Sequence, residues 1–333
     1  MVNPLRNDSP GLRRAWHPVL RASALTDTPV HVELLGDAWV LARLDGEVRV
    51  FIDKCPHRNA RLSDGCIVGN QLQCPFHGWE FDASGKCTHI PALGKGATVP
   101  PTSRLTPSAD VQEKYDLIWI APDVPVCEIL SVPEWDDPSL SVVWLPCIDV
   151  KATAGQVIDN FLDFAHFPFV HAGTFGAGED ALIPPYEVQS TMDGWGFVVD
   201  YHHKINNKED PLVATGEHPL LQPRVMKYNF GAPFIATLRL DFPLTGMVNL
   251  ITMFVQPLDA TTSRVYCGML RNDFTDQASR DAAVDYELKV FAEDTRILEH
   301  LWNNEIPLDV GQAHTRADRN TVEFRRIMSR LLA

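Results

Sequence analysis

The chain has 333 residues, of which 45% are hydrophobic and 22% are charged, and its formal net charge is −14. This size and composition predict a globular protein with two domains, and the acidic balance argues against nucleic acid as a partner. The N-terminus lacks the apolar segment of a signal peptide. The most apolar stretch, 242–258, is interrupted by Pro243, Gly246, Asn249 and Gln256, so it predicts buried strands and no membrane span.

An all-β domain is predicted in residues 1–122. Its apolar runs are separated by turn dipeptides such as Asp45-Gly46, which is a strong hairpin signal. The strands expected in this domain are 30–35, 39–44, 48–52 and 117–120. A proline-rich connection at 123–150 follows, so we assign residues 151–333 to a second domain.

The first domain contains two pairs of cysteine and histidine. Cys55 and His57 form a C-x-H pair, and Cys74 and His77 form a C-x-x-H pair. Two thiolates and two imidazoles are the ligands of a Rieske [2Fe–2S] centre, in which the two histidines hold one iron. A structural zinc site is the alternative, but zinc usually takes both cysteines from one loop and both histidines from the other. The five remaining cysteines are scattered, which predicts a reducing, cytoplasmic compartment.

The second domain is predicted to combine helices with a mainly antiparallel sheet, which makes the chain an α+β protein. A helix is expected at 154–167, and a longer one at 278–302 with Thr275 or Asp276 as its N-cap. The strands expected between them are 186–189, 196–202, 234–240, 247–255 and 263–270.

The first of these helices carries a second possible metal site. At about 100° per residue, Asp159, Asp163 and His166 lie on one helix face. Pro168 removes an N–H and clashes with the preceding turn, so we expect the helix to end or kink there and to bring His171 beside His166. Two imidazoles and one carboxylate, with open coordination positions, form the facial triad of an oxygen-activating non-haem Fe(II) site.

The carboxylate of this triad must come from elsewhere, and the late helix offers Asp294. Its spacing from Phe291 and Leu298 places Asp294 on the buried face of that helix. A buried acid needs a metal or a cation as its partner. An ion pair, with Arg296 or Arg316, is the alternative to a role as iron ligand.

Together these motifs resemble those of the terminal oxygenase component of Rieske non-haem iron oxygenases. The likeness covers nearly the whole chain. Its most specific stretches are C-P-H-R-x-A-x-L-S-x-G from Cys55, C-P-F-H-G-W from Cys74, and D-N-x-x-D-x-x-H-x-x-x-x-H from Asp159. The compact members are the most similar, namely dicamba O-demethylase, vanillate and caffeine demethylases, toluenesulfonate methyl-monooxygenase and saxitoxin-type hydroxylases.

The resemblance implies a fold, a set of ligands and an assembly. The fold is an all-β Rieske domain followed by a catalytic domain with an antiparallel sheet and helices, similar to a helix-grip fold. The implied ligands are Cys55, His57, Cys74 and His77 for the [2Fe–2S] cluster and His166, His171 and Asp294 for the mononuclear Fe(II). Asp163 would bond His166 in its own subunit and His77 of a neighbouring one, in a head-to-tail homotrimer. Asn160 would bond a metal-bound water or cap the helix.

We therefore expect a monooxygenase component that hydroxylates or oxidatively demethylates a small aromatic or heterocyclic substrate with O₂ and electrons from NAD(P)H. No ferredoxin or reductase module is fused, so separate electron-transfer proteins are expected. Two alternatives stay open: cis-dihydroxylation of an arene, and a Rieske protein that only transfers electrons. The motif at 159–171 argues against the latter, since an electron carrier needs no second metal. Pocket walls are expected from Leu162, Phe169 and strands between about Val198 and Cys267.

Overall fold

A computed structural model describes residues 4–94, 96–176, 180–207, 210–309 and 311–333. The chain divides into two compact units. The β unit contains residues 10–128 with 257–259, and the α+β unit contains the N-terminal residues up to Ser9 together with 129–256 and 260–333. In the part of the chain that the structure describes, no helix is long and apolar enough to cross a membrane.

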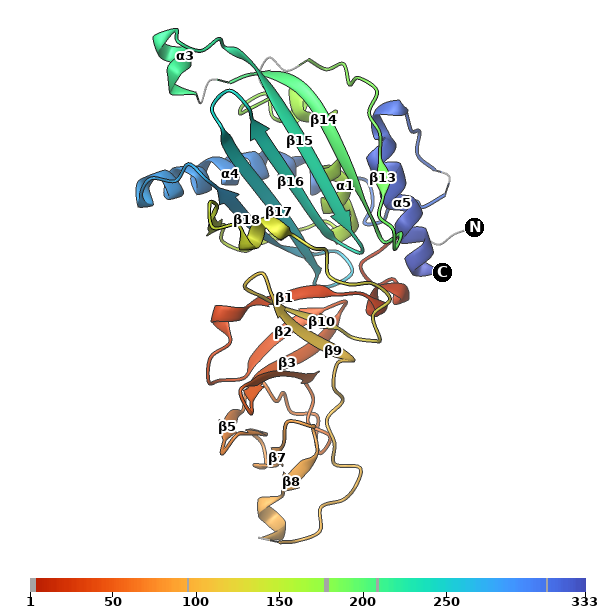
Figure 1. The fold of residues 1–333 in the computed structure, drawn as a ribbon. Coiled ribbons are helices and arrows are strands. Elements are labelled where there is room, and N and C mark those ends of the chain that lie inside the picture. Colours follow the sequence, from red (N-terminus) through yellow and green to blue (C-terminus); the bar gives the residue numbers. More distant parts are fainter. Residues whose placement is uncertain (1–3, 95, 177–179, 208–209, 310) are drawn as a thin grey trace. The chain divides into compact units, whose positions relative to one another are not determined.

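The described residues of the β unit form three small antiparallel sheets (Figure 1). The first sheet joins β1 (His17–Arg21), β10 (Leu117–Ala121) and β9 (Asp110–Lys114), in that order. The second joins β2 (Val30–Leu34), β3 (Asp37–Leu44) and β4 (Glu47–Ile52), and the third joins β5 (Cys66–Val68), β6 (Gln71–Gln73), β7 (Glu80–Phe81) and β8 (Cys87–His89). The four strands expected from the sequence are all present, with ends shifted by one or two residues.

Strand β3 is buried on both faces because two cores meet at it. Trp39 and Leu41 face the core shared with the first sheet, whereas Val40, Ala42 and Leu44 face the core that reaches the third sheet. Side chains alternate between the two faces of a strand. A strand that is apolar at both alternating sets of positions therefore fits between two cores.

The start of β1 carries a buried histidine that should make stability depend on pH. His17 is fully buried, and its Nε2–H donates to the carbonyl of Leu12 (2.8 Å). Burial lowers the pKa of His17 to about 4, although the bond to Leu12 raises it, whereas an unfolded histidine has a pKa of about 6.5. The unfolded state therefore binds more protons between these two values, and stability is lost as the pH falls through this window, by roughly 3 kcal/mol in total.

We expect His17→Gln, which can keep the bond to Leu12 but does not titrate, to lose less unfolding free energy than the wild type between about pH 7.5 and about pH 5. Urea unfolding at the two pH values measures this difference. His300→Gln, at an exposed position, is the control and should behave like the wild type. An acid loss in His17→Gln as large as that of the wild type would contradict the prediction.

The α+β unit contains an eight-stranded sheet in the order β11-β18-β17-β16-β15-β14-β13, with β12 also paired to β18. Its strands are β11 (Ser141–Trp144), β12 (Ile148–Val150), β13 (Gln189–Ser190), β14 (Gly196–Asn206), β15 (Leu221–Gly231), β16 (Ile235–Phe242), β17 (Met247–Pro257) and β18 (Ser263–Arg271). The predicted strand at 186–189 is reduced to the short β13, and the proline-rich range 123–150 includes β11 and β12.

Strand β15 is missing from the sequence prediction. Its inward positions begin with the polar residues Gln222 and Arg224 and continue with Met226, Tyr228 and Phe230. Because the buried face starts with polar side chains, the apolar alternation that signals a strand is hidden.

Within the described ranges, five α-helices accompany the sheet: α1 (Ala154–Leu162), α2 (Phe167–Val170), α3 (Pro211–Thr215), α4 (Gln277–Leu298) and α5 (Arg319–Leu332). The predicted late helix corresponds to α4, and its N-cap is Asp276, whose side chain accepts from Ser279 N. Helix α5 is absent from the sequence prediction although its buried residues Phe324, Ile327 and Leu331 have the helical period.

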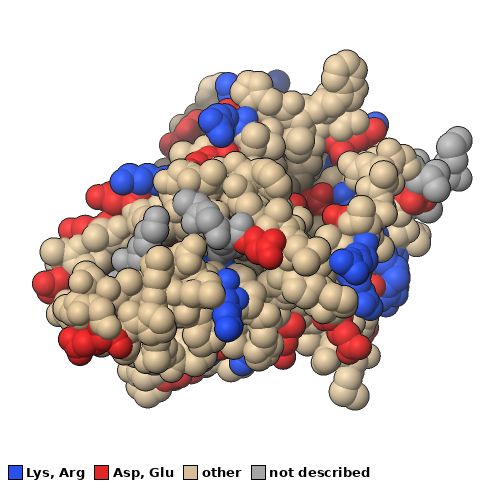
Figure 2. Space-filling model, turned by 90° about the horizontal axis from the view of Figure 1, so that it is seen from above, with Lys and Arg blue, Asp and Glu red and all other residues tan. Residues whose placement is uncertain are grey.

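Helix α1 lies between α4 and α5 and contacts β16, so it is held from several sides (Figure 1). Its first turn is closed by a capping box between Thr153 and Gln156. Asn7 from the N-terminal segment accepts a bond from Ala154 N (2.9 Å), which satisfies another free donor of this turn. On the face in Figure 2, acidic and basic side chains are interspersed among larger uncharged areas.

Candidate metal centres and substrate cavity

The two loops that carry the cysteine and histidine pairs have the same backbone hydrogen bonds. In the first loop, Cys55 N donates to the carbonyl five residues on (2.9 Å), and Asn59 N donates to Cys55 O (3.0 Å). In the second loop, Cys74 N and Gly78 N make the equivalent bonds (2.8 and 3.0 Å). Asn59 (φ 58°) and Gly78 (φ 70°) occupy equivalent left-handed positions, which these residue types tolerate best. Two equivalent tight turns therefore present the two cysteines.

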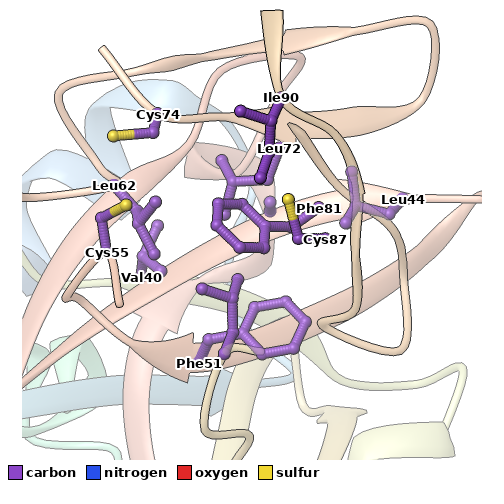
Figure 3. Packing of buried hydrophobic residues seen from close by; sticks show 12 residues of the cluster. Val40, Leu44, Phe51, Cys55, Leu62, Leu72, Cys74, Phe81, Cys87 and Ile90 are labelled. Atoms are coloured by element: carbon purple, nitrogen blue, oxygen red, sulfur yellow. The ribbon is translucent and has the colours of Figure 1, made fainter. Parts of the chain in front are cut away.

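Cys55 and Cys74 are buried at the edge of a hydrophobic core, with exposed fractions of 1% and 2%. Figure 3 shows both sulfur atoms on the same side of this core, near Leu62, while Cys87 lies beside Phe81. Burial, with a smaller contribution from the neighbouring Cys74, raises the pKa of the Cys55 thiol to about 11. A metal that binds these sulfurs must therefore displace protons.

The imidazoles of the two loops lie against each other. The rings of His57 and His77 have centroids 4.5 Å apart in an edge-on arrangement, and His57 also stacks on Trp79 at 4.5 Å. Desolvation, His77 and Arg58 all lower the pKa of His57, which favours the neutral ring that a metal ligand requires. Within the described residues, the one group of donor atoms close enough to share a single ion lies in the other unit.

In the α+β unit, α1 ends at Leu162, so the expectation of a helix up to Pro168 was wrong. Asp163 has extended backbone (φ −83°, ψ 122°), and its side chain accepts from Ala165 N (2.8 Å), which competes with the helical pattern. From α5, Asn320 donates to the carbonyl of Leu162 and so satisfies the end of the helix. Pro168 instead lies in the first turn of α2, where it is tolerated.

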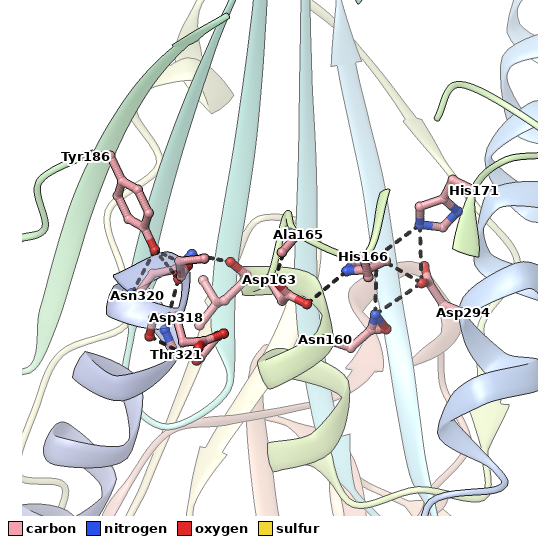
Figure 4. A network of polar contacts seen from close by, with 12 residues as sticks. Asn160, Asp163, Ala165, His166, His171, Tyr186, Asp294, Asp318, Asn320 and Thr321 are labelled. Carbon is pink, nitrogen blue, oxygen red and sulfur yellow. Dashed lines mark hydrogen bonds and ion pairs between the residues drawn. The ribbon is translucent and has the colours of Figure 1, made fainter. Parts of the chain in front are cut away.

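The break brings His171 beside His166, as the sequence predicted, although it lies earlier in the chain. The Nε2 atoms of the two rings are 3.1 Å apart. Asp294 from α4 completes the group, with Oδ1 at 3.4 Å from His166 Nε2 and 3.3 Å from His171 Nε2 (Figure 4). Ligands about 2.1 Å from a metal and at right angles lie about 3 Å apart, so these three atoms fit one face of an octahedral ion.

Among the residues that the structure describes, Asp294 forms no ion pair with Arg296 or Arg316, so the ion-pair alternative finds no support. Asp294 instead accepts from Asn160 Nδ2 (3.1 Å) and faces the two histidines. Desolvation raises its pKa, but the bonds to His166 and His171 outweigh this and lower it. The carboxylate is therefore held ionised at the centre of the group.

Each histidine of the group has a carboxylate at its other ring nitrogen. His171 Nδ1–H donates to Glu293 Oε2 (2.9 Å), and His166 Nδ1 lies 3.4 Å from Asp163 Oδ2. A carboxylate that accepts from Nδ1–H fixes the tautomer that leaves the lone pair on Nε2. Burial lowers the pKa of His166, but Asp163 and Asp294 raise it to about 9 overall in the metal-free protein.

Glu293 is a functional residue whose geometry the sequence did not reveal. Thr174 Oγ1 also donates to Glu293 Oε2 (2.7 Å), and a Cβ at Gly173 would come within 2.6 Å of Glu293 Oε1. The glycine thus leaves room for the carboxylate beside His171. The available signal in the sequence was that Glu293 is an acidic residue directly before the proposed ligand Asp294.

We expect Glu293→Gln to weaken iron binding at the triad by about 10- to 100-fold, because an amide does not attract the Nδ1–H of His171 as a carboxylate does. Iron titration of the metal-free protein, followed by calorimetry, measures this affinity. Glu299→Gln, a change near the end of the same helix, is the control. Unchanged iron affinity in Glu293→Gln would contradict the orienting role.

Asp159 does not share a face with Asp163 and His166, because the helix ends between them. It forms an ion pair with Arg325 of α5 (Nη2 to Oδ2, 2.8 Å). Burial raises the pKa of Asp159, and Arg325 opposes this. Helix α5 therefore holds α1 twice, through Arg325 at Asp159 and through Asn320 at Leu162.

A cavity of about 410 Å³ opens beside the triad, between the sheet, α1 and α4. His166, His171 and Asp294 form one part of its wall, and Asn160 lies beside them. The remaining walls are mainly apolar. They include Phe161, Met226, Tyr228, Leu238, Ile251, Met253, Met269, Val290 and Phe291.

The predicted cavity walls are partly correct. The strands expected to line the cavity do so, from Ile205 in β14 to Met269 in β18. Leu162 and Phe169 do not line it: Leu162 is fully buried in the core, and the side chain of Phe169 is 72% exposed. The sequence prediction omitted the wall contributed by α4, including Val290.

Comparison with known proteins agrees with both centres. The Rieske [2Fe-2S] domain matches residues 15–107, and the vanillate O-demethylase oxygenase C-terminal domain matches residues 150–333. The methylxanthine N1-demethylase NdmA of Pseudomonas putida is 29% identical over 96% of this chain and 89% of that protein. A structure of an NdmA mutant with theobromine superposes with a TM-score of 0.83, at 28% identity, over 96% of this chain and 90% of that one.

A structure of dicamba monooxygenase bound to 3,6-dichlorosalicylic acid has the same fold, with a TM-score of 0.81 over 96% of this chain and 97% of that one, at 22% identity. The curated dicamba O-demethylase oxygenase component, from Stenotrophomonas maltophilia, is 36% identical over 48% of each chain. The chain is an enzyme that belongs to the Rieske non-haem iron oxygenases, in the group whose catalytic domain is that of the vanillate O-demethylase oxygenase.

Proposed function

We propose that this protein is a terminal oxygenase that oxidatively demethylates a small, planar, methylated aromatic or heterocyclic compound. The observation that carries this proposal is the triad of donor atoms at the wall of the apolar cavity, with spacings of 3.1, 3.4 and 3.3 Å. NdmA is named as a methylxanthine N1-demethylase and a second relative as a dicamba O-demethylase component. Both names describe removal of a methyl group from a ring compound.

Enzymes of this family carry a Rieske [2Fe–2S] cluster and a mononuclear iron. We assign Cys55, His57, Cys74 and His77 to the cluster and His166, His171 and Asp294 to the iron. When bound, these groups supply single electrons and activate O₂. The donor types support the assignment, since thiolates with imidazoles suit the cluster and two imidazoles with one carboxylate suit Fe(II).

The residues around the triad orient the ligands and the reactants. Glu293 fixes the ring of His171, and Asp163 lies at the corresponding position on His166. Asn160 Nδ2 lies 3.1 Å from Asp294 Oδ1 and 3.5 Å from His166 Nε2, so its amide can bond a water or substrate atom at the triad. The apolar walls exclude bulk water and leave room for a flat ring.

The overall reaction uses O₂, two electrons and two protons. One oxygen atom enters the methyl C–H bond, and the other leaves as water. A hydroxymethyl group on oxygen or nitrogen then breaks down to formaldehyde and the demethylated substrate. The electrons reach the enzyme from a separate electron-transfer protein, which we take to be a ferredoxin or a flavin reductase.

We also propose that three chains assemble head to tail, so that the cluster of one subunit serves the iron of the next. The side chain of Asp163 supports this, because it is 32% exposed although it contacts His166, whose side chain is only 14% exposed. Oδ2 of this carboxylate stays near the iron ligand, and Oδ1, which accepts from Ala165 N, keeps a second lone pair for a partner. Mass photometry of the purified protein tests this assembly, and a monomer at working concentration would contradict it.

The function is tested by turnover of a panel of methoxy-arenes and N-methyl heterocycles with a surrogate ferredoxin, a reductase and NADH. We expect one formaldehyde for each O₂ consumed and a product that has lost one CH₂ unit. A product that instead gains two oxygen and two hydrogen atoms would show cis-dihydroxylation. Electron uptake without O₂-dependent product from any methylated compound would overturn the proposal.

A further inference from the structure

A buried amide oxygen without a hydrogen-bond partner lies in the cavity wall, within the part of the chain that the structure describes. Asn249 belongs to β17, whose alternate residues line the cavity, and its exposed fraction is 9%. Its Oδ1 is covered by the protein and accepts no hydrogen bond from any residue that the structure describes. A buried polar atom in this state is unfavourable and calls for an explanation.

The strand register places this amide relative to the triad. One cross-strand row consists of Met226, Leu240 and Asn249. The next row on the same face consists of Tyr228, Leu238 and Ile251. Tyr228 packs against Phe161 of α1, with ring centroids 6.0 Å apart, and α1 carries Asn160, which bonds Asp294. Asn249 therefore lies one row, about 7 Å, beyond the row that touches the helix of the iron site.

The cavity neighbours of Asn249 on its own strand and on β16 are apolar, whereas Arg224 of β15 and Arg271 of β18 also line the cavity. The cavity residues that β16 and β17 contribute are Leu238, Leu240, Phe242, Met247, Asn249, Ile251 and Met253, of which Asn249 alone is polar. A ligand that cannot hydrogen-bond a single amide in such a wall leaves that amide unpaired. The amide therefore discriminates strongly between ligands that can pair with it and ligands that cannot. One row is also close to the width of an aromatic ring.

We propose that Asn249 selects the substrate by binding the N–H and C=O edge of a methylated cyclic amide, whose reacting methyl group points to the triad. This inference rests on the proposed function. A primary amide presents one acceptor and one donor side by side, which complements a lactam or imide edge. Rotation about χ2, which is soft in asparagine, presents either amide atom to the cavity.

The acceptor atom of Asn249 favours this neutral edge over a carboxylate, and of the three cations among the described residues that line the cavity, Arg224, Arg271 and Lys289, the last is exposed. A carboxylate has no hydrogen for Asn249 Oδ1, and it would need a cation. Arg271 already donates to both carboxylate oxygens of Asp273 (2.8 and 2.7 Å). Arg224 donates from Nε to His203 Nε2 (2.8 Å).

The test compares two xanthines that differ in the substituent on one ring nitrogen. Theobromine has an imide N–H between two carbonyls, and caffeine has a methyl group on that nitrogen. We expect the iron-loaded, cluster-containing wild type to bind theobromine at least about ten-fold more tightly than caffeine in anaerobic calorimetry. Asn249→Leu should bring the two affinities together, whereas a preference set by size alone would survive this substitution.

Two further measurements separate folding from recognition. Asn249→Leu removes a buried amide oxygen that has no partner, so its thermal unfolding temperature should equal or exceed that of the wild type. The matched control is Gln256→Leu in the same strand, because Gln256 Oε1 accepts from Tyr266 Oη (2.9 Å). This control should lower the unfolding temperature and keep the preference for theobromine.

The proposal is overturned if the wild type binds both xanthines equally, if it binds neither, or if Asn249→Leu keeps the wild-type ratio. Formaldehyde release is measured in parallel. The expected binding ratio without O₂-dependent formaldehyde from any methylated compound of the panel would support the role of Asn249 and refute the demethylase. Formaldehyde release with an unchanged binding ratio in Asn249→Leu would support the demethylase and refute the role of Asn249.

Discussion

Replacing Asp294 with alanine should remove the mononuclear iron and leave the cluster intact. Asp294 is the one carboxylate whose oxygen lies within 3.4 Å of both His166 Nε2 and His171 Nε2 in the described part of the chain. Two imidazoles alone leave the third position of the triad empty, and the activation supplied by a bound metal is worth several kcal/mol. We expect product formation to fall by about 10³-fold or more.

Metal analysis and absorbance check this result. The wild type should contain two cluster irons and one mononuclear iron per chain, and Asp294→Ala should keep the red-brown colour with only the two. Asp285→Ala, at an exposed position of the same helix, should retain all three. Cys55→Ser should lose the colour instead. An Asp294→Ala protein with its full iron content would remove Asp294 from the ligand set.

Asp163→Asn should keep both metal centres and nearly abolish turnover. Asp163 Oδ1 accepts from Ala165 N (2.8 Å), and an amide oxygen can do the same, so the loop after α1 should survive. The other oxygen lies 3.4 Å from His166 Nδ1. An amide nitrogen there would place one donor against another and remove the negative charge. We expect a loss of about 100-fold or more in turnover.

Single-turnover kinetics locate this loss. In the wild type, the reduced cluster should be oxidised rapidly when O₂ is mixed with the substrate-bound enzyme. In Asp163→Asn this step should be slow, although dithionite reduces the cluster normally. Asp200→Asn, an exposed change in β14, serves as the control. Cluster oxidation at the wild-type rate in Asp163→Asn would refute the connecting role.

The features that the sequence predicted correctly are those set by residues close together in the chain. The two cysteine–histidine loops and the H-x₄-H spacing could be recognised because each pair of donors lies within one short segment, where chain geometry brings the two side chains together. The strands of the β unit were confirmed because turn residues and alternation are local signals. The end of α1 was misplaced because it depends on Asn320, which is 158 residues away along the chain.

The sequence by itself determined the kinds of donor atoms, and hence the two classes of metal centre and the family. Only the tertiary structure decided which residues surround these donors. It places Glu293 at the second ring nitrogen of His171, Arg325 at Asp159 and Asn249 in the cavity wall. The physical reason is register. A shift of one residue in a strand turns its side chains to the other face. Which of them face the iron is therefore set by the pairing of distant strands and by the packing of α1 against α4 and α5.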